Sequence, residues 1–295
     1  MLGGTVGDVR QPRRLVQVLA VVAVVFAMPA CGSAPTRPER GSPAVAHPSA
    51  TAAASQSAAG TGRSGGGRLG ESPAPRPSTG VSAGPGTAAA RYGWDDLVAR
   101  DDFSGSELHP SWGAYDSAGN SGEGVRSPRQ ISLRNGVLRM TGTPDGTTAG
   151  MAWRHPQKYG RWETRARFPA GCGCYHPVLI LWPADDPWPA GGEIDYAEVF
   201  DGPRQELNFF LHYGADNRQL HATRQVDMTR WHNFAVEWTP DHVTGYLDGE
   251  PYFHTNRRDV LPPGRMNQTI QLDWFPGPTA GGASLEVDWV AMYRL

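Results

Sequence analysis

Short runs of alternating apolar and polar residues fill the chain beyond residue 92, separated by clusters of Gly, Pro, Asn and Asp. In Gly160–Phe168, the residues Trp162, Thr164, Ala166 and Phe168 fall on one face and the charged residues on the other. Successive side chains of a strand point to opposite faces of its sheet. The run therefore predicts a strand with one buried face.

Later segments follow the same pattern. Trp231–Trp238 and His242–Leu247 predict two strands joined by a turn, and Ser284–Tyr293 predicts a strand that closes the chain. Asp248–Gly249 predicts a hairpin turn, because such turns favour Asp-Gly at their two central positions. No long segment has a convincing helical period, so we expect an all-β fold, a sandwich of two packed antiparallel sheets.

The distribution of aromatic residues divides the chain. All ten tryptophans lie between Trp94 and Trp289, whereas residues 32–91 contain no aromatic residue. A segment without aromatic side chains cannot bury enough apolar surface to offset the entropy lost on ordering. We therefore predict a disordered linker rich in Ala, Ser, Gly and Pro over residues 32–91 and one folded domain over 92–295.

The first 31 residues have the pattern of a secretory signal peptide. Arginines, including the pair Arg13-Arg14, precede the apolar run Leu15–Ala30, which is short for a membrane-spanning helix. An uncleaved anchor and a twin-arginine signal are alternatives. Cys31 follows the run directly and resembles a bacterial lipoprotein processing site. We expect a protein that is secreted or extracytoplasmic, with Cys31 either lipid-anchored or incidental.

Charge limits the partners of the folded part. Residues 92–295 carry 18 Lys and Arg against 26 Asp and Glu, a net charge of −8. An acidic domain argues against nucleic acid as a partner, because phosphate binding needs a basic face. We expect a neutral polymer as substrate and a monomeric protein.

Cys172 and Cys174 flank a single glycine. Two thiolates alone make a poor zinc site, which usually has four ligands. A disulfide is possible in an exported protein, and two free thiols are the alternative. We assign neither cysteine a catalytic role.

Candidate chemistry lies on the acidic segment Glu193–Glu198. Glu193 and Asp195 share a strand face, but Glu198 lies at an odd offset and would point to the opposite face. A β-bulge near Tyr196-Ala197 adds one residue and brings all three carboxylates to one face. Neighbouring carboxylates cannot all stay ionised, which suits a glycosidase that needs one ionised nucleophile and one protonated acid. A calcium site or a solvated acidic edge is the alternative.

With this segment the sequence resembles glycoside hydrolase family 16, in particular its laminarinase-like branch, whose hallmark is a bulged E-x-D-x-x-E strand on a concanavalin-like β-jelly-roll. The resemblance covers nearly all of residues 94–295. Further matches to family segments occur in order along the chain, at Asp101–Gly105, Tyr159–Phe168, Trp188–Asp195, Trp231–Gly249 and Val287–Tyr293.

The resemblance implies a retaining endo-glycosidase acting on a β-1,3- or mixed-linkage β-glucan. Glu193 would be the nucleophile, Glu198 the general acid/base, and Asp195 a residue that tunes their protonation. No cofactor would be needed for catalysis. A non-catalytic surface carbohydrate-binding protein and a transglycosylase that remodels wall polysaccharide are the alternative functions.

The resemblance also suggests substrate-binding residues. Trp188 would stack on a sugar, unless it is a core residue, and His212 would face the cleft from a neighbouring strand, unless it is structural. Trp182, His176 and Trp274 complete this expected set.

One part of the family pattern is altered. The family usually has W-P-x-x-W before the catalytic strand, with both tryptophans lining the cleft. Here His176 and Ile180 stand at those positions, and Trp182 follows on the same strand face as Ile180. The sugar platform is therefore changed, and the identity of the glucan is left open.

The resemblance finally implies a structural calcium on the side of the sandwich away from the catalytic strand. Asp288 and the segment Asp102–Gly105 would supply its oxygen ligands. Solvated acids at the ends of strands are the alternative.

Overall fold

The computed structural model of the chain describes Gly84 and residues 86–184, 188–277 and 281–295. These residues fall within one compact unit, Pro73–Leu295. The predicted signal peptide, Cys31 and most of the predicted linker lie outside them. Within the described ranges, no helix is long and apolar enough to cross a membrane.

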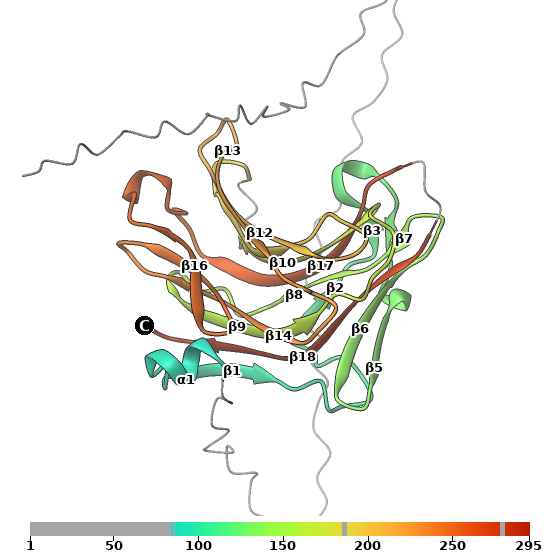
Figure 1. Cartoon of the computed structure of the whole chain (residues 1–295), viewed down its shortest axis with the longest axis horizontal. Helices are drawn as coiled ribbons and strands as arrows, with labels where there is room; N and C mark the ends of the chain where they lie inside the picture. The colour runs from blue at the N-terminus through green and yellow to red at the C-terminus, as the bar shows by residue number, and fades with distance from the viewer. Residues whose placement is uncertain (1–83, 85, 185–187, 278–280) are drawn as a thin grey trace, which may run out of the picture. The chain divides into compact units, whose positions relative to one another are not determined.

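Two large antiparallel sheets stack as curved layers (Figure 1). The eight-stranded sheet has the order β16-β15-β14-β9-β18-β6-β5, and β1 also pairs with β18. Its strands are β1 (Leu97–Asp101), β5 (Ile131–Arg134), β6 (Val137–Gly142), β9 (Gly160–Arg167), β14 (His232–Trp238), β15 (Val243–Leu247), β16 (Glu250–Thr255) and β18 (Ala283–Tyr293).

The seven-stranded sheet has the order β13-β12-β11-β10-β17-β8-β2. Its strands are β2 (Trp112–Ala114), β8 (Gly150–Trp153), β10 (Tyr175–Pro183), β11 (Glu193–Glu198), β12 (Glu206–Tyr213), β13 (Arg218–Gln225) and β17 (Met266–Trp274). A small third sheet joins β3 (Ser117–Ala118), β4 (Val125–Arg126) and β7 (Thr147–Thr148), and its β4–β7 pair is parallel. The expected all-β sandwich of antiparallel sheets is confirmed, with this small sheet as an addition.

The hydrophobic core fills the space between the two large sheets. Trp162 of β9 and Trp238 of β14 are fully buried and stack with ring centroids 6.4 Å apart. Leu179 of β10 and Ile270 of β17 belong to the same cluster. Fully burying one large apolar side chain stabilises a fold by about 1.5–3 kcal/mol. The opposite face of β17 carries polar side chains.

The strands predicted from alternation are present as β9, β14, β15 and β18. The predicted hairpin joins β15 to β16, and its two central residues, Asp248 and Gly249, have φ values of 50° and 75°. Positive φ at both positions is what a type I′ turn requires. The only helices among the described residues are short: α1 (Ala88–Tyr92), η1 (Asn120–Gly122), η2 (Pro128–Gln130) and η3 (Arg258–Val260).

The outer face of β9 departs from the simple pattern of charged residues opposite the core. Glu163 lies on that face but is fully buried, because α1 covers it. Its two carboxylate oxygens accept hydrogen bonds from the backbone N–H groups of Ala88 (2.6 Å) and Ala89 (3.1 Å). Figure 1 shows α1 beneath β18, on the side away from the seven-stranded sheet. The packed part therefore begins a few residues before position 92, inside the range predicted as linker.

Candidate active site

The carboxylate strand β11 contains the predicted bulge. Its pairing with β10 matches Ile180 to Asp195 and Leu179 to Ala197, so Tyr196 is the extra residue. The pairing with β12 shifts in the same interval, between Asp195 and Glu198. One added residue changes the alternation of the strand, so that residues at an odd offset on either side of the bulge point to the same face. Glu193, Asp195 and Glu198 consequently form one row on the face away from the core, which we call the carboxylate row.

Polar contacts hold the bulge in place from the core side. The Tyr196 hydroxyl lies 2.9 Å from Thr164 Oγ1 and accepts a hydrogen bond from Gln268 Nε2, also at 2.9 Å. The backbone carbonyl of Tyr196 accepts a hydrogen bond from the Tyr252 hydroxyl at 2.6 Å. An extra residue in a strand disrupts the regular ladder. The Tyr252 contact supplies a donor at this position.

His212 on β12 holds the middle carboxylate. His212 pairs with Glu193 across the strands, and its Nε2–H donates to Asp195 Oδ2 at 3.1 Å while Nδ1 lies 2.8 Å from Asn217 Oδ1. Burial opposes a charge on His212, but the hydrogen bond and charge of Asp195 outweigh it and raise the His212 pKa to about 9. His212 is therefore an imidazolium at neutral pH. Both of its N–H groups then have acceptors.

Glu193 and Asp195 share a proton. Burial and the charge of Asp195 raise the pKa of Glu193 to about 9, and burial raises the pKa of Asp195 to about 6. Asp195 Oδ1 is buried without a hydrogen-bond donor from another group. A proton held between the two carboxyls supplies that donor and removes one of two adjacent charges.

Glu198 ends the row at the C-terminal end of β11. Burial, followed by the charges of Asp273 and Glu193, raises its pKa to about 8. His176 Nδ1 lies 4.0 Å from Glu198 Oε1. Burial and the charge of Arg204 lower the His176 pKa to about 4, so this imidazole is neutral and does not favour ionisation of Glu198. At neutral pH, Glu198 carries a proton.

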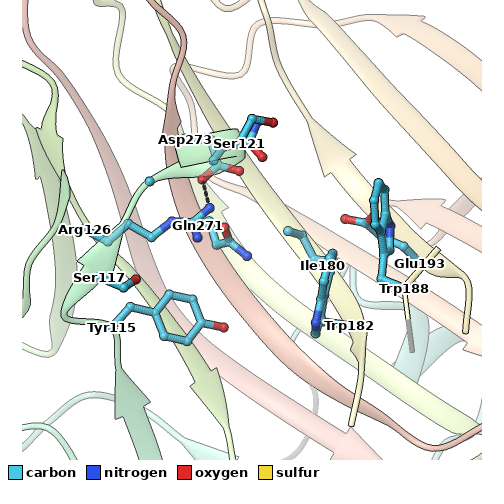
Figure 2. A pocket seen from close by; sticks show the side chains of 12 residues that line it. Tyr115, Ser117, Ser121, Arg126, Ile180, Trp182, Trp188, Glu193, Gln271 and Asp273 are labelled. Atoms are coloured by element: carbon cyan, nitrogen blue, oxygen red, sulfur yellow. Dashed lines mark hydrogen bonds and ion pairs between the residues drawn. The ribbon is translucent and has the colours of Figure 1, made fainter. Parts of the chain in front are cut away.

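A cavity of about 540 Å³ opens beside Glu193. Figure 2 shows Tyr115, Ser117 and Arg126 on one side of it and Trp182, Trp188 and Glu193 on the other. Its complete lining is Tyr115, Ser117, Gly119, Asn120, Ser121, Arg126, Ile180, Trp182, Trp188, Glu193, Gln271 and Asp273. The cavity combines flat aromatic surfaces with many hydrogen-bonding groups, a combination suited to sugar rings.

Two tryptophans form one side of the cavity. The rings of Trp182 and Trp188 are nearly parallel, at 15°, with centroids 6.1 Å apart. Trp188 is 43% exposed, so it is no core residue, and its Nε1–H donates to Glu193 Oε2 at 2.9 Å. The predicted residues Trp182, Trp188 and His212 therefore come together with the carboxylate row.

Asp273 and Arg126 were not predicted as site residues. Arg126 Nη2 donates to Asp273 Oδ1 at 2.6 Å, and both line the cavity. Asp273 could have been found from alternation along β17, where Asn267, Thr269, Gln271 and Asp273 form a polar face. Arg126 lies on short β4 in the small sheet, where no local pattern marks it.

Trp274 lies outside the cavity lining. It is one position beyond Asp273 and turns towards the core side of β17, where it packs against the main cluster. Glycines lie against its ring: a Cβ at Gly124 or Gly146 would come within 3.0 Å and 2.9 Å of it, respectively. The position of Trp274 gives it a packing contact and no direct place in the cavity.

The residues predicted to hold calcium are already paired with arginines. Arg100 donates to Asp102 Oδ1 at 2.8 Å, and Arg165 forms an ion pair with Asp288 Oδ2 at 3.0 Å. These guanidinium groups neutralise the carboxylates that a calcium ion would need, so the donor set does not fit the ion as it stands. We assign no step to a metal at Asp102, Gly105 and Asp288.

Among the residues that the structure describes, one group of His, Cys, Asp and Glu is compact enough to hold a metal: Glu193, Asp195 and His212, with ligand atoms within 4.8 Å of one another. Its members already bind one another and Trp188. Cys172 and Cys174 form a disulfide, which settles the alternative left open by their spacing.

The chain is similar to known glycoside hydrolases in sequence and in fold. A sequence model described as "Glycosyl hydrolases family 16" matches residues 120–291. The endo-1,3-1,4-beta-glycanase EglC of Rhizobium meliloti (strain 1021) is 27% identical over 191 residues, which are 57% of this chain and 40% of that protein. A beta-glucanase of Rhodothermus marinus is 28% identical over 165 residues, covering 46% of this chain and 57% of that protein.

The chain thus spans about half the length of the curated relatives it matches. The crystal structure of LamAcat from Zobellia galactanivorans superimposes with a TM-score of 0.61 at 18% identity, covering 69% of this chain and 99% of that one. This likeness shows the fold, and the family match extends over more than half of the chain. The chain belongs to glycosyl hydrolase family 16.

Proposed function

We propose that this protein is an endo-acting, retaining glycoside hydrolase that cleaves β-glycosidic bonds in a β-1,3- or mixed-linkage β-glucan. The observation that carries the proposal is the carboxylate row on bulged β11. Two glutamates stand at its ends, and Asp195 lies between them. Retaining glycosidases use two carboxyl groups about 5–5.5 Å apart, one as nucleophile and one as acid/base.

Glu193 acts as the nucleophile and Glu198 as the acid/base. In the first step, Glu193 attacks the anomeric carbon while Glu198 gives its proton to the glycosidic oxygen. A bond to Glu193 forms, and the bond to the leaving sugar breaks. In the second step, Glu198 takes a proton from water, whose oxygen displaces Glu193 from the anomeric carbon. Two inversions retain the β configuration.

The protonation of the row suits these roles. Glu198 has a pKa of about 8 and holds the proton that the first step requires. Glu193 must be ionised to attack, which it achieves when the proton shared with Asp195 moves to Asp195. The Trp188 N–H favours charge on Glu193, as a hydrogen bond to the ionised form lowers a pKa. Asp195 thereby stores the proton that Glu193 gives up.

Binding is assigned to the aromatic and polar groups beside Glu193. Trp182 and Trp188 present flat surfaces on which the apolar face of a sugar stacks, while Arg126 and Asp273 offer hydrogen bonds to hydroxyls. The names of the relatives, a 1,3-1,4-β-glycanase and a β-glucanase, support a β-glucan as substrate. Ile180, where the family usually has tryptophan, removes one stacking surface and leaves the linkage to be measured.

We infer that the enzyme is a monomer and that it acts outside the cytoplasmic membrane. It is either secreted or anchored to the membrane by a lipid on Cys31. The apolar run Leu15–Ala30 supports export. The Cys172–Cys174 disulfide supports it independently, because disulfides persist in oxidising compartments. Incorporation of a radioactive fatty acid distinguishes the two forms. A wild-type protein that takes up no label, or a Cys31→Ser variant that takes up as much as the wild type, contradicts the lipid anchor.

A panel of laminarin, lichenan, agarose, xyloglucan and carrageenan tests the function. Laminarin or lichenan is expected to yield oligosaccharides, and Glu193→Gln is expected to lose hydrolysis by roughly a thousandfold or more while still binding the polymer. Glu107→Gln, at an exposed position, is the matched control. Full activity in Glu193→Gln contradicts the nucleophile assignment. Binding without cleavage by the wild type supports a carbohydrate-binding protein, and longer products support a transglycosylase.

A further inference from the structure

Aromatic rings cover the sheet face beyond Glu198. Phe275 and His176 have ring centroids 4.2 Å apart, His176 and Phe200 are 4.9 Å apart, and Phe200 and Phe210 are 5.8 Å apart. His221 continues the series, stacked on Phe210 at 4.2 Å. We call these five residues the aromatic band. His176, Phe210 and His221 lie on β10, β12 and β13, whereas Phe275 follows β17 directly and Phe200 lies two residues beyond β11.

The aromatic band offers rings to solvent. Phe200 is 36% exposed and Phe275 is 37% exposed, an unusual state for phenylalanine. Contiguous exposed apolar surface often marks a binding site. His176 between them is neutral at neutral pH, so the three rings form a continuous uncharged surface.

The aromatic band adjoins the acid/base end of the carboxylate row. His176 lies 4.0 Å from Glu198, whereas Trp188 contacts Glu193 at the other end of β11. None of the five rings lines the cavity beside Glu193. Two aromatic surfaces therefore flank the carboxylate row, one next to each glutamate.

A disulfide-closed loop braces the segments that carry the exposed rings. Cys174 accepts a hydrogen bond from the Phe275 N–H at 2.8 Å through its backbone carbonyl. In the same loop, the Gly171 N–H donates to the Gly202 carbonyl at 3.1 Å, two residues beyond Phe200. The Cys172–Cys174 bridge closes this loop. Rings held in place before binding lose less entropy when a ligand arrives.

We propose that the aromatic band binds the sugar units on the leaving-group side of the cleaved bond. This inference rests on the proposed function, in which Glu198 protonates the oxygen that joins those units to the rest of the chain. A sugar on that oxygen lies next to Glu198 and can stack on His176, Phe200 and Phe275. The ligand is a run of neutral hexopyranose units, because His176, Phe200 and Phe275 offer it uncharged ring faces on which to stack.

The same surface holds an incoming acceptor. Because deglycosylation reverses the geometry of the first step, a sugar bound on the aromatic band occupies the position from which water attacks. A hydroxyl of that sugar, deprotonated by Glu198, can displace Glu193 in place of water. The band therefore favours some transfer at high oligosaccharide concentration.

The test compares two substrates that share the same donor sugars. One is an unmodified β-glucan oligosaccharide with sugars on both sides of the cleaved bond. The other is an aryl glycoside whose leaving group contains no sugar. For Phe200→Ala and Phe275→Ala, we expect kcat/KM on the oligosaccharide to fall about tenfold, and kcat/KM on the aryl glycoside to stay within about twofold. Tyr92→Ala, an exposed aromatic on α1, is the matched control and is expected to change neither.

The outcomes separate this inference from the proposed function. A wild type that cleaves neither substrate contradicts the proposed function. If the wild type cleaves both and the variants lose activity equally on both, the rings act through folding or through Glu198, and the inference is wrong. Unchanged activity on both substrates overturns it as well. Thermal unfolding of each variant identifies a loss that comes from misfolding.

Discussion

The indole N–H of Trp188 donates a hydrogen bond to Oε2 of Glu193 over 2.9 Å. Trp188 also stacks on Trp182 and remains 43% exposed. One side chain thus contributes both a surface for a sugar and a donor to the proposed nucleophile. This contact ties binding of the substrate ring to the charge of the group that attacks it.

Replacing Trp188 with phenylalanine separates these two contributions. Trp188→Phe keeps an aromatic ring but removes the N–H, so the ionised form of Glu193 loses a hydrogen bond whose contribution is about 1.5–3 kcal/mol. The pKa of Glu193 should rise, the acid limb of the pH–kcat profile should move to higher pH, and kcat should fall about tenfold or more. Trp188→Ala, which also removes the ring, should raise KM in addition. An unmoved acid limb in Trp188→Phe contradicts a role for this hydrogen bond.

The alkaline limb of activity should report the proton on Glu198. Its pKa of about 8, raised by burial and by the charges of Asp273 and Glu193, predicts that kcat/KM falls as pH rises through 8. Asp273→Asn removes one of these charges, so the pKa of Glu198 should drop and the limb should shift to lower pH.

The control for this shift is Asp216→Asn, at an exposed position on a different segment. Melting temperatures of both variants separate the shift from a stability loss caused by leaving Arg126 without its partner. An identical alkaline limb in Asp273→Asn and the wild type would argue against Glu198 as the acid.

The buried contact between Glu163 and α1 predicts a stability effect distant from the site. Glu163→Ala leaves the N–H groups of Ala88 and Ala89 without an acceptor, which should cost about 2 kcal/mol of unfolding free energy, measured in urea. Glu107→Ala, an exposed change, should cost little.

The same contact should depend on pH. Burial raises the pKa of Glu163 from 4.5 to about 7, so the native state holds this proton more tightly than the unfolded state. Its contribution is fully present below pH 4.5 and is lost as pH rises through 7. The difference in unfolding free energy between the wild type and Glu163→Ala should therefore become smaller as the pH rises from 4.5 through 7. A difference that becomes larger with rising pH would contradict a raised pKa for Glu163 in the native state.

Local patterns in the sequence were sufficient for four strands of the eight-stranded sheet, β9, β14, β15 and β18, and for the bulge in β11. Alternation identified β9 and β18, and the odd offset between Glu193 and Glu198 required one extra residue, which is Tyr196. These features depend on neighbours in the sequence, as does the Asp248-Gly249 turn. The burial of Glu163 could not be predicted in this way, because it depends on α1 from a distant part of the chain.

The site was only partly predictable for the same reason. The E-x-D-x-x-E row and Trp188 all lie within residues 188–198, whereas Arg126 and Asp273 meet only because the small sheet lies against β17. Trp274 was expected in the cleft, yet strand parity turns it to the core side while Asp273 faces the cavity. Counting parity along β17 would have corrected that expectation. The rings of the aromatic band come from five separate strands or strand ends, so no local motif marks them.

The anomeric configuration of the first product tests the central claim most directly. A cleaved β-glucan can be followed by proton NMR in the first minutes of reaction, before the released anomers equilibrate. Double displacement through Glu193 predicts that the β-anomer appears first and the α-anomer only later by mutarotation. Initial release of the α-anomer would contradict the assigned roles of Glu193 and Glu198.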